Sequence, residues 1–452
     1  MADEQGGAVA DAARDAVATT WRAQSARIVA ALAHLTRDVP LAEDLAQEAV
    51  AQALEQWPRD GIPENPAAWL TTVGRRRAID LFRRGDALAT RYELIAREPG
   101  FGTVSDPAAL VDGGVDDDVL RLIFVACHPV LGREARIALT LRVVAGLQSE
   151  EIARAFVVPV ATVQQRVVRA KKTLRAAKVP FETPSAGEFD TRLADVLEVI
   201  YLVFTEGYAA TSGDTWVRAD LAREAIRLGT LVARLVPRDA ETHALVALME
   251  LQASRFEARV DAEGDAILLD DQDRSLWDAA AIARGLGSLD LADSLIDSRG
   301  RGPYALQAAI AACHARAQEP ADTDWTEVVV LYDALLNLRP SPVVALNRAV
   351  AVSRSTGPAT ALRLVDAIAR GGRLDDYAPL HAVQGDLLER LGHAAPAARA
   401  FRTAASLSVN ERERAVLLRR AEELDPGGGA PPPSAIMPLN DTTSPHEKEE
   451  PR

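Results

Sequence analysis

Residues 146–172 read GLQSEEIARAFVVPVATVQQRVVRAKK, a pattern that predicts a helix, a tight turn and a second helix dense in cations. Three of the four lysines in the chain, Lys171, Lys172 and Lys178, lie towards the end of this second helix. From Val160 to Lys178 there are six basic residues and no acidic residue, although the whole chain has a net charge of −14. This reversal of charge favours contact with a polyanion, and the surrounding pattern is that of a helix-turn-helix.

The predicted helix-turn-helix divides into a small apolar core and a polar face. The expected core residues are Ile152, Ala153, Phe156, Val163 and Val167. Pro159 falls in the turn, where its missing N–H leaves no helix bond unmade. Thr162, Gln164, Gln165 and Arg166 should reach base edges, and Arg169, Lys171, Lys172 and Arg175 should contact phosphates. An ordinary helix pair with a solvated basic face is the alternative, because helix-turn-helix patterns often match by chance.

The bulk composition favours an all-helical globular protein. The chain has 452 residues, of which 48% are apolar and 26% charged, so two to four domains are expected. Aromatic residues make up only 5%, while helix-forming Ala, Leu, Arg and Glu are abundant. No apolar run is long enough for a membrane span and no secretory signal is recognised, so a cytoplasmic protein is expected.

The chemistry-bearing residues give no sign of an enzyme. Cys127 and Cys313 are far apart, which argues against a disulfide framework or a CxxC zinc site. Cys127 and its neighbour His128 are expected to be packing or capping residues. No paired carboxylates, nucleophile elbow, phosphate loop or metal cluster stands out, so we expect no catalysis, no cofactor and no metal.

An acidic helix precedes the basic motif. The apolar spacing predicts a helix at 41–57, with an opposite face carrying Glu43, Asp44, Glu48 and Glu55. DNA would repel this face, so it should point towards a basic protein surface. A face that only aids solubility is the alternative.

An arginine-rich helix follows at 67–84, after a loop rich in Pro and Gly. Its basic residues are Arg75, Arg76, Arg77, Arg83 and Arg84. Cations beside the aromatic Trp69 and Phe82 suit a separated nucleic-acid strand, because cations hold the backbone and an aromatic group receives an unstacked base. The alternative is that Trp69 and Phe82 are core residues.

The composition along the chain predicts five segments after a frayed start at 1–17. They are a helical domain at 18–90, a flexible linker at 91–118, a helix-turn-helix domain at 119–182, a helical repeat domain at 187–425 and a disordered tail at 426–452. Within the fourth, Gly385, Gly392, Ala397, Phe401 and Ala404 have the spacing of small and aromatic positions in a tetratricopeptide helix pair. A plain helical bundle remains the alternative.

The order of these elements resembles bacterial RNA polymerase sigma factors of the extracytoplasmic-function class. Residues 43–48 (EDLAQE) are similar to region 2.2, which implies that Asp44, Gln47 and Glu48 dock on the β′ clamp helices of core polymerase. Residues 68–80 resemble regions 2.3–2.4, and 146–175 resemble region 4. The fold implied is two small helical polymerase- and DNA-binding domains followed by a tetratricopeptide-like α-solenoid.

The resemblance also implies which residues read the promoter. Those implied for the −10 element are Asp60, Asn65, Trp69, Arg75, Arg76, Arg77 and Arg83. Those implied for the −35 element are Thr162, Gln164, Gln165, Arg166, Arg169 and Lys172, and the β flap of the polymerase is a further partner. The chain departs from the family at Arg76, where Asn is usual, and at Val157, where Gly is usual.

Residues 201–208 (YLVFTEGY) look like the stretch that opens the C-terminal extension in one group of these sigma factors. Tyr201, Phe204 and Tyr208 are expected to form an aromatic seam between the extension and region 4, with a ligand site as the less favoured reading. In that group the extension itself is implicated in activity, without a membrane-bound anti-sigma partner. A repeat domain also offers a groove for a peptide or protein partner.

The sequence therefore predicts a cytoplasmic, nucleoid-associated sigma factor that binds core RNA polymerase and promoter DNA, with no membrane partner, and is regulated through its helical repeat domain. One alternative is a standalone helix-turn-helix activator with a tetratricopeptide sensor domain. Another is a repeat scaffold whose basic helices bind acidic peptides.

Overall fold

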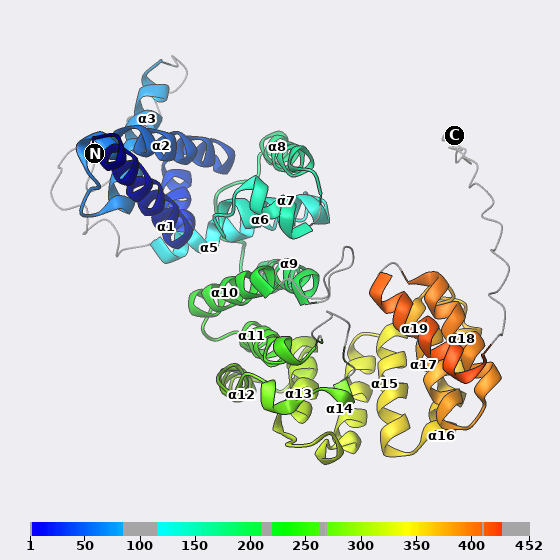
Figure 1. Cartoon of the computed structure of the whole chain (residues 1–452). Helices are drawn as coiled ribbons and strands as arrows, with labels where there is room; N and C mark the ends of the chain where they lie inside the picture. Colours follow the sequence, from blue (N-terminus) through cyan, green and yellow to red (C-terminus); the bar gives the residue numbers. More distant parts are fainter. Residues whose placement is uncertain are drawn as a thin grey trace, which may run out of the picture. The chain divides into compact units, whose positions relative to one another are not determined.

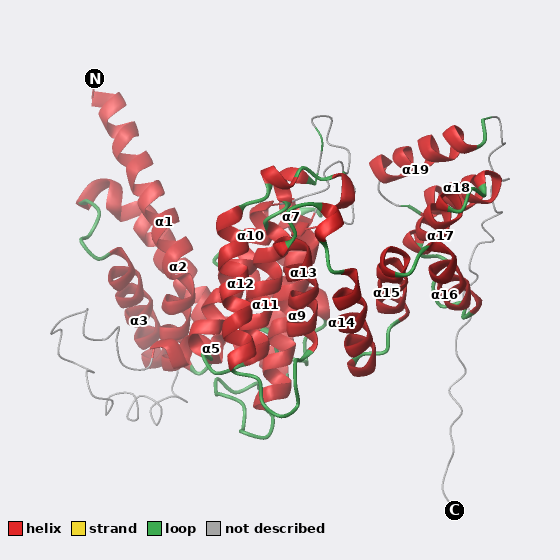
Figure 2. Cartoon of the chain, turned by 90° about the horizontal axis from the view of Figure 1, so that it is seen from below, coloured by secondary structure: helices red, strands yellow, loops and turns green. Residues whose placement is uncertain are grey.

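The computed structural model describes residues 2–84, 115–156, 158–208, 219–259, 261, 267, 269–408 and 411–426, and every regular element in these ranges is a helix (Figures 1 and 2). This confirms the all-α prediction. Most of the predicted linker, Val157 and all but the first residue of the predicted tail lie outside the described residues. The chain divides into two compact units, 1–344 and 345–452.

The predicted region 2 consists of α1 (Ala2–Thr36), α2 (Val39–Asp60) and α3 (Pro66–Arg84). Helix α1 begins at Ala2, well before the predicted start of the helical domain at residue 18, so the expectation of a frayed 1–17 is wrong. The first 17 residues are rich in Ala, the best helix former, and Ala13 and Val17 are buried.

Helix α2 is capped at its start and continues past the predicted end. The Asp38 side chain accepts a hydrogen bond from the backbone N–H of Leu41 at 2.8 Å, which satisfies an otherwise open donor. Pro58 lies inside the last turn, and Gly61 caps the C-terminal end of the helix with a φ of 88°, which suits glycine. Asp60 is therefore the last residue of α2 and not part of a loop.

The predicted region 4 consists of α5 (Val115–Ala126), α6 (Arg133–Val143), α7 (Ser149–Phe156) and α8 (Val160–Ala176). Helices α7 and α8 form the predicted helix-turn-helix, and four of its five expected core residues are buried: Ile152, Ala153, Val163 and Val167. Residues 116–118, expected at the end of the linker, instead form the acidic first turn of α5, where their charges favour the helix dipole.

The extension within the first unit begins with α9 (Phe189–Tyr208), α10 (Ala219–Leu235) and α11 (Ala240–Ala253). It continues with α12 (Ala279–Ser294), α13 (Pro303–Arg316) and α14 (Trp325–Leu338). Glycines allow these helices to pack closely. A Cβ at Gly207 would lie 2.5 Å from the backbone N of Ala222, so α9 and α10 could not approach this closely with any larger residue there.

The second unit holds most of α15 (Pro342–Ser355), followed by α16 (Pro358–Arg370), α17 (Ala378–Arg390), α18 (Ala394–Leu407) and α19 (Glu411–Leu424). Phe401 is fully buried, and a Cβ at Gly385 would lie 2.6 Å from its ring. The expected pairing of a small and an aromatic residue between two helices is therefore present. No helix in the described residues is both long and apolar enough to cross a bilayer.

Candidate functional site

The acidic face of α2 lies against the basic helix α8. Glu43 is only 3% exposed, and its carboxylate accepts hydrogen bonds from Arg142 at 3.1 Å and from Lys171. The Lys171 ammonium also donates to Asp44 at 2.7 Å. Two residues from the predicted region 4 thus neutralise a carboxylate that would otherwise be buried at high cost.

Further ion pairs extend this contact. The Arg175 guanidinium lies 3.4 Å from Asp38 and 3.6 Å from Asp44, and Arg22 on α1 pairs with Glu151 on α7. Lys171 and Arg175, expected to contact phosphates, are therefore paired with carboxylates of region 2 in this structure.

The backbone also fits closely at this contact. Gly146 has a φ of 72°, and a Cβ there would lie 2.5 Å from the hydroxyl oxygen of Ser25 and 3.3 Å from the carbonyl oxygen of Trp21. Because α1 leaves no room for a side chain at position 146, the two regions are packed tightly against each other. We call the contact formed by Glu43, Asp44, Arg142, Lys171 and Arg175 the interdomain latch.

The three residues implied for polymerase binding differ in their surroundings. Asp44 is exposed but belongs to the latch, and Glu48 is exposed with Arg77 at 3.9 Å. Gln47 is half-buried, and its amide nitrogen has no hydrogen-bond partner. Glu48 is therefore the implied residue that another protein reaches without disturbing the latch.

The arginine helix α3 presents its cations beside a pair of tryptophans. Trp69 is half-buried and meets Trp57 edge to face, with ring centroids 5.5 Å apart. Arg76, Arg77 and Arg83 are exposed on the same helix, while Arg75 is half-buried. Trp69 is thus neither fully core nor free, an arrangement that suits a ring with one edge open to a base.

The loop before α3 contains the predicted residue Asn65 and an exposed apolar residue, Ile62, that the sequence did not single out. The Asn65 side chain accepts a hydrogen bond from the backbone N–H of Ala68 at 3.1 Å, so it caps α3 at its first turn. Ile62 is 46% exposed on this loop, near exposed Asp60. The available signal for Ile62 was an apolar residue in the short Pro- and Gly-containing segment between two amphipathic helices.

The exposed face of α8 carries most of the residues implied for the −35 element. Gln164, Gln165, Arg169 and Lys172 are exposed, while Thr162 is half-buried. Val168 lies on this face with 64% of its surface exposed, and sequence reasoning missed it. An apolar side chain among glutamines and arginine is suited to the methyl group of a thymine.

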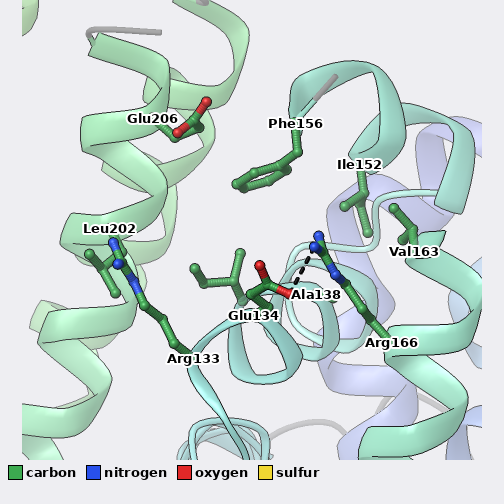
Figure 3. A pocket seen from close by; sticks show the side chains of 10 residues that line it. Arg133, Glu134, Ala138, Ile152, Phe156, Val163, Arg166, Leu202 and Glu206 are labelled. Atoms are coloured by element: carbon green, nitrogen blue, oxygen red, sulfur yellow. Dashed lines mark ion pairs between the residues drawn. The ribbon is translucent and has the colours of Figure 1, made fainter. Parts of the chain in front are cut away.

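Arg166 departs from this face. Its guanidinium forms an ion pair at 2.8 Å with Glu134 on α6, and it lines a pocket of about 330 Å³ (Figure 3). In Figure 3, Phe156 and Arg166 lie on one side of this pocket, and Leu202 and Glu206 of α9 lie on the other. In this structure Arg166 therefore faces the extension side of the helix-turn-helix.

The aromatic residues of α9 point to the opposite side. The Tyr201 ring meets Tyr304 on α13 with centroids 5.6 Å apart, and Phe204 stacks with Tyr208 at 5.6 Å. These contacts lie within the extension, whereas Leu202 and Glu206 border region 4. The predicted aromatic seam is thus placed on the inner face of α9, because its side chains follow the 3.6-residue period and share a face every three to four residues.

Other α9 residues join the extension to region 4. The Phe189 and Phe124 rings meet edge to face at 5.3 Å, Arg192 donates to the carbonyl of Phe124 at 2.7 Å, and Arg136 pairs with Asp195 at 3.6 Å. The extension therefore packs on the core of region 4 through both apolar and charged contacts.

Cys127 and His128 pack and cap as the sequence predicts. Burial raises the pKa of the Cys127 thiol to about 11, and its sulfur lies 3.3 Å from the Thr140 hydroxyl. The Nδ1 atom of His128 accepts a hydrogen bond from the backbone N–H of Val130 at 3.1 Å. No group of three metal-ligating side chains occurs among the residues with described positions.

The pairing of Arg166 gives a testable expectation for DNA binding. Glu134→Gln should raise the affinity of the chain for a −35 duplex by about threefold, because it frees the guanidinium from an exposed ion pair whose contribution is below about 1 kcal/mol. Fluorescence anisotropy measures this. The gain should vanish when Arg166→Ala is added, and a gain that persists in the double variant would assign it to a general loss of negative charge.

Comparison with known proteins identifies both DNA-binding regions. Residues 9–87 match the family Sigma-70 region 2, residues 121–174 match Sigma-70, region 4, and residues 192–293 match a family of unknown function, DUF6596. These matched ranges coincide with α1–α3, with α5–α8 and with α9–α12.

One relative matches most of the chain, and two others match about a third of it. An uncharacterised protein of Rhizobium meliloti is 46% identical over 399 residues, 87% of this chain and 92% of that protein. The probable ECF RNA polymerase sigma factor SigI of Mycobacterium tuberculosis is 28% identical over 36% of this chain and 56% of its own length. The ECF RNA polymerase sigma factor SigK of Mycobacterium ulcerans is 27% identical over 37% of this chain and 88% of its own length. The chain therefore belongs to the same family as the Rhizobium meliloti protein, and its region 2 and region 4 domains make it an RNA polymerase sigma factor of the sigma-70 type.

Proposed function

We propose that this sigma factor belongs to the extracytoplasmic-function class and directs promoter recognition, promoter melting and initiation by core RNA polymerase. Region 2 would bind the polymerase through the exposed Glu48 and Asp44, and α3 would hold the opened −10 strand. Region 4 would read the −35 element through the exposed face of α8. The observation that carries the proposal is that one chain combines a glutamine- and arginine-bearing α8 face with an α3 that sets arginines beside a half-buried tryptophan.

We further propose that the free chain must open before it works. Asp44 is implied in polymerase binding, yet it pairs with Lys171 and Arg175 from region 4. One carboxylate cannot serve the latch and a polymerase surface equally well, so polymerase and DNA together compete with the latch for the same charges.

The extension is the proposed regulator of this opening. It contacts region 4 through α9, and Arg227 on α10 lies near region 4 with its guanidinium 3.5 Å from the carbonyl of Ala145. We propose that its α17–α18 pair is tetratricopeptide-like, supported by the Gly385–Phe401 contact, and that the extension holds a protein or peptide partner.

Binding to sigma-free core polymerase tests the proposal. Glu48→Ala should weaken the affinity about tenfold, because it removes a charge at a protein interface without touching the latch. Glu257→Ala, an exposed carboxylate in the extension, is the matched control and should bind like wild type. A standalone activator would instead bind promoter DNA by itself and show no affinity for sigma-free core.

A further inference from the structure

The extension contains a partly buried cluster of arginines and aromatic rings at the end of α9. The Arg259 guanidinium lies over the Tyr208 ring, 3.7 Å from its centroid, and the Arg255 guanidinium donates a hydrogen bond to the Tyr208 hydroxyl. Arg255 also lies 5.7 Å from the ring centroid of Trp277, and Arg274 lies 4.7 Å from the same ring. Three cations thus surround two aromatic rings.

No carboxylate of the described residues pairs with Arg255 or Arg259. Their recorded partners are the hydroxyl and ring of Tyr208 and the ring of Trp277. Burial and the charge of Arg255 lower the pKa of Arg259, so the surroundings oppose its positive charge. Two partly buried cations that no carboxylate of the described residues pairs with are costly, which distinguishes this cluster from the ion pairs elsewhere in the described chain.

Buried polar atoms without partners lie in the same cluster. They include the Nη1 atom of Arg259, the indole N–H of Trp277 and the Nδ1 atom of His314, none of which has a hydrogen-bond partner among the described residues. Trp277 is only 7% exposed. An indole N–H and a guanidinium can only donate, so the atom that satisfies them must be an acceptor.

The pKa of His314 is lowered by burial and by the same positively charged surroundings. Burial lowers its pKa to about 4, and the charges of Arg255 and Arg274 lower it further in the same direction. The imidazole is therefore neutral at neutral pH and adds no charge of its own. Its ring lies 5.2 Å from that of Trp325, which continues the aromatic wall of the cluster.

We propose that this cluster binds a small oxyanion ligand, a carboxylate or a phosphate. Arg255 and Arg259 would pair with its oxygens, the Trp277 indole N–H would donate a further hydrogen bond, and Tyr208 and Trp277 would form apolar walls. Charge-assisted bonds to guanidinium groups are strong in such surroundings, so the ligand supplies the missing acceptor and the missing negative charge together.

The position of the cluster connects it to region 4. Tyr208 is the last residue of α9, and Leu202 and Glu206, six and two residues earlier on this helix, border the pocket beside the helix-turn-helix. An occupant held by Tyr208 and Arg259 would therefore restrain the helix that packs on region 4. This places a small-molecule site in the extension, in addition to the proposed role in transcription.

Thermal melting of the full chain tests the site directly. The probes are sodium phosphate and sodium benzoate, each compared with sodium chloride at equal ionic strength. At about a hundred times the dissociation constant, the bound probe should raise the melting temperature of wild type by roughly 3–8 °C. A response to phosphate alone or to benzoate alone identifies which oxyanion class the site takes, and titration calorimetry on wild type measures the affinity.

Arg259→Gln separates a ligand site from a structural role. The variant should lose the probe effect and, without probe, melt at or above the temperature of wild type, because it removes an uncompensated buried charge. Arg223→Gln, an exposed arginine on α10, is the matched control and should keep the full probe effect. If wild type melts alike in phosphate, benzoate and chloride, or if Arg259→Gln keeps the probe effect, the proposal is overturned.

Discussion

Glu43→Ala should lower the stability of the first unit by about 3 kcal/mol, near the lower end of what breaking a buried ion pair costs. Glu43 is 3% exposed and accepts hydrogen bonds from Arg142 and Lys171, whose side chains are 14% and 15% exposed. Removing the carboxylate leaves two cations with too few partners. In a thermal melt this corresponds to a fall of roughly 6–12 °C.

Two variants control this expectation. Glu43→Gln keeps the shape of the side chain and one acceptor for Arg142. Its melting temperature should therefore lie between those of Glu43→Ala and wild type. Glu55→Ala removes an exposed carboxylate from the same helix and should change stability by less than about 0.5 kcal/mol. Glu43→Ala and Glu55→Ala melting at the same temperature would show that the latch does not stabilise the free chain.

Replacing both Arg166 and Arg169 by alanine should reduce promoter affinity of the holoenzyme about 100-fold or more, since each good contact to a base contributes about 1–3 kcal/mol. Arg169 is exposed on the reading face of α8, while Arg166 must first leave Glu134. Arg169→Ala alone should therefore have the larger of the two single effects. Anisotropy with a labelled promoter, using core polymerase and each variant, measures the change.

Lys172→Ala is the informative comparison for this pair. An exposed lysine near the end of α8 is expected to contact a DNA phosphate, so its loss should weaken binding to all sequences alike. The slope of log affinity against log salt concentration should become shallower by about one. Arg166→Ala with Arg169→Ala should instead weaken a consensus −35 element more than a scrambled one. An equal loss of affinity for the consensus and the scrambled element would show that these arginines do not read bases.

The helix-turn-helix could be predicted from the sequence because its signals are local. The apolar spacing and Pro159 define α7 and α8, and four of its five predicted core residues are buried. Phe156 is half-buried because the pocket beside α9 lies at its ring. That exception depends on a helix more than thirty residues later, which no local pattern reveals.

The latch could not be predicted because it joins distant residues. Glu43 reads as one of four acidic residues on a helix face, yet it is buried by Arg142 and Lys171, which lie 99 and 128 positions later. Charge patterns show which faces are acidic or basic, but the sequence does not say which of them meet. The same limit applies to Arg166, whose partner Glu134 lies on a helix that the motif does not include.

In the extension, helix periodicity predicts which residues share a helix face but not which helix that face contacts. The sequence identified Tyr201, Phe204 and Tyr208 as an aromatic set, and the structure brings them together on one face of α9. Which neighbour that face covers depends on the packing of α11 and α13. Residue spacing alone therefore could not show that these rings pack within the extension and not against region 4. The cluster of Arg255 and Arg259 with Tyr208 and Trp277 could not be predicted either, because it depends on how separate segments of the extension pack together.

Run-off transcription with sigma-free core polymerase tests the central claim most directly. Core polymerase and this chain, with a library of promoter fragments, should give discrete transcripts that start at defined positions and that Trp69→Ala or Arg169→Ala sharply reduces. Core polymerase without the chain should give none. If the chain yields no specific transcript with core polymerase, but raises transcription when a different sigma factor is already present, it is an activator and not a sigma factor.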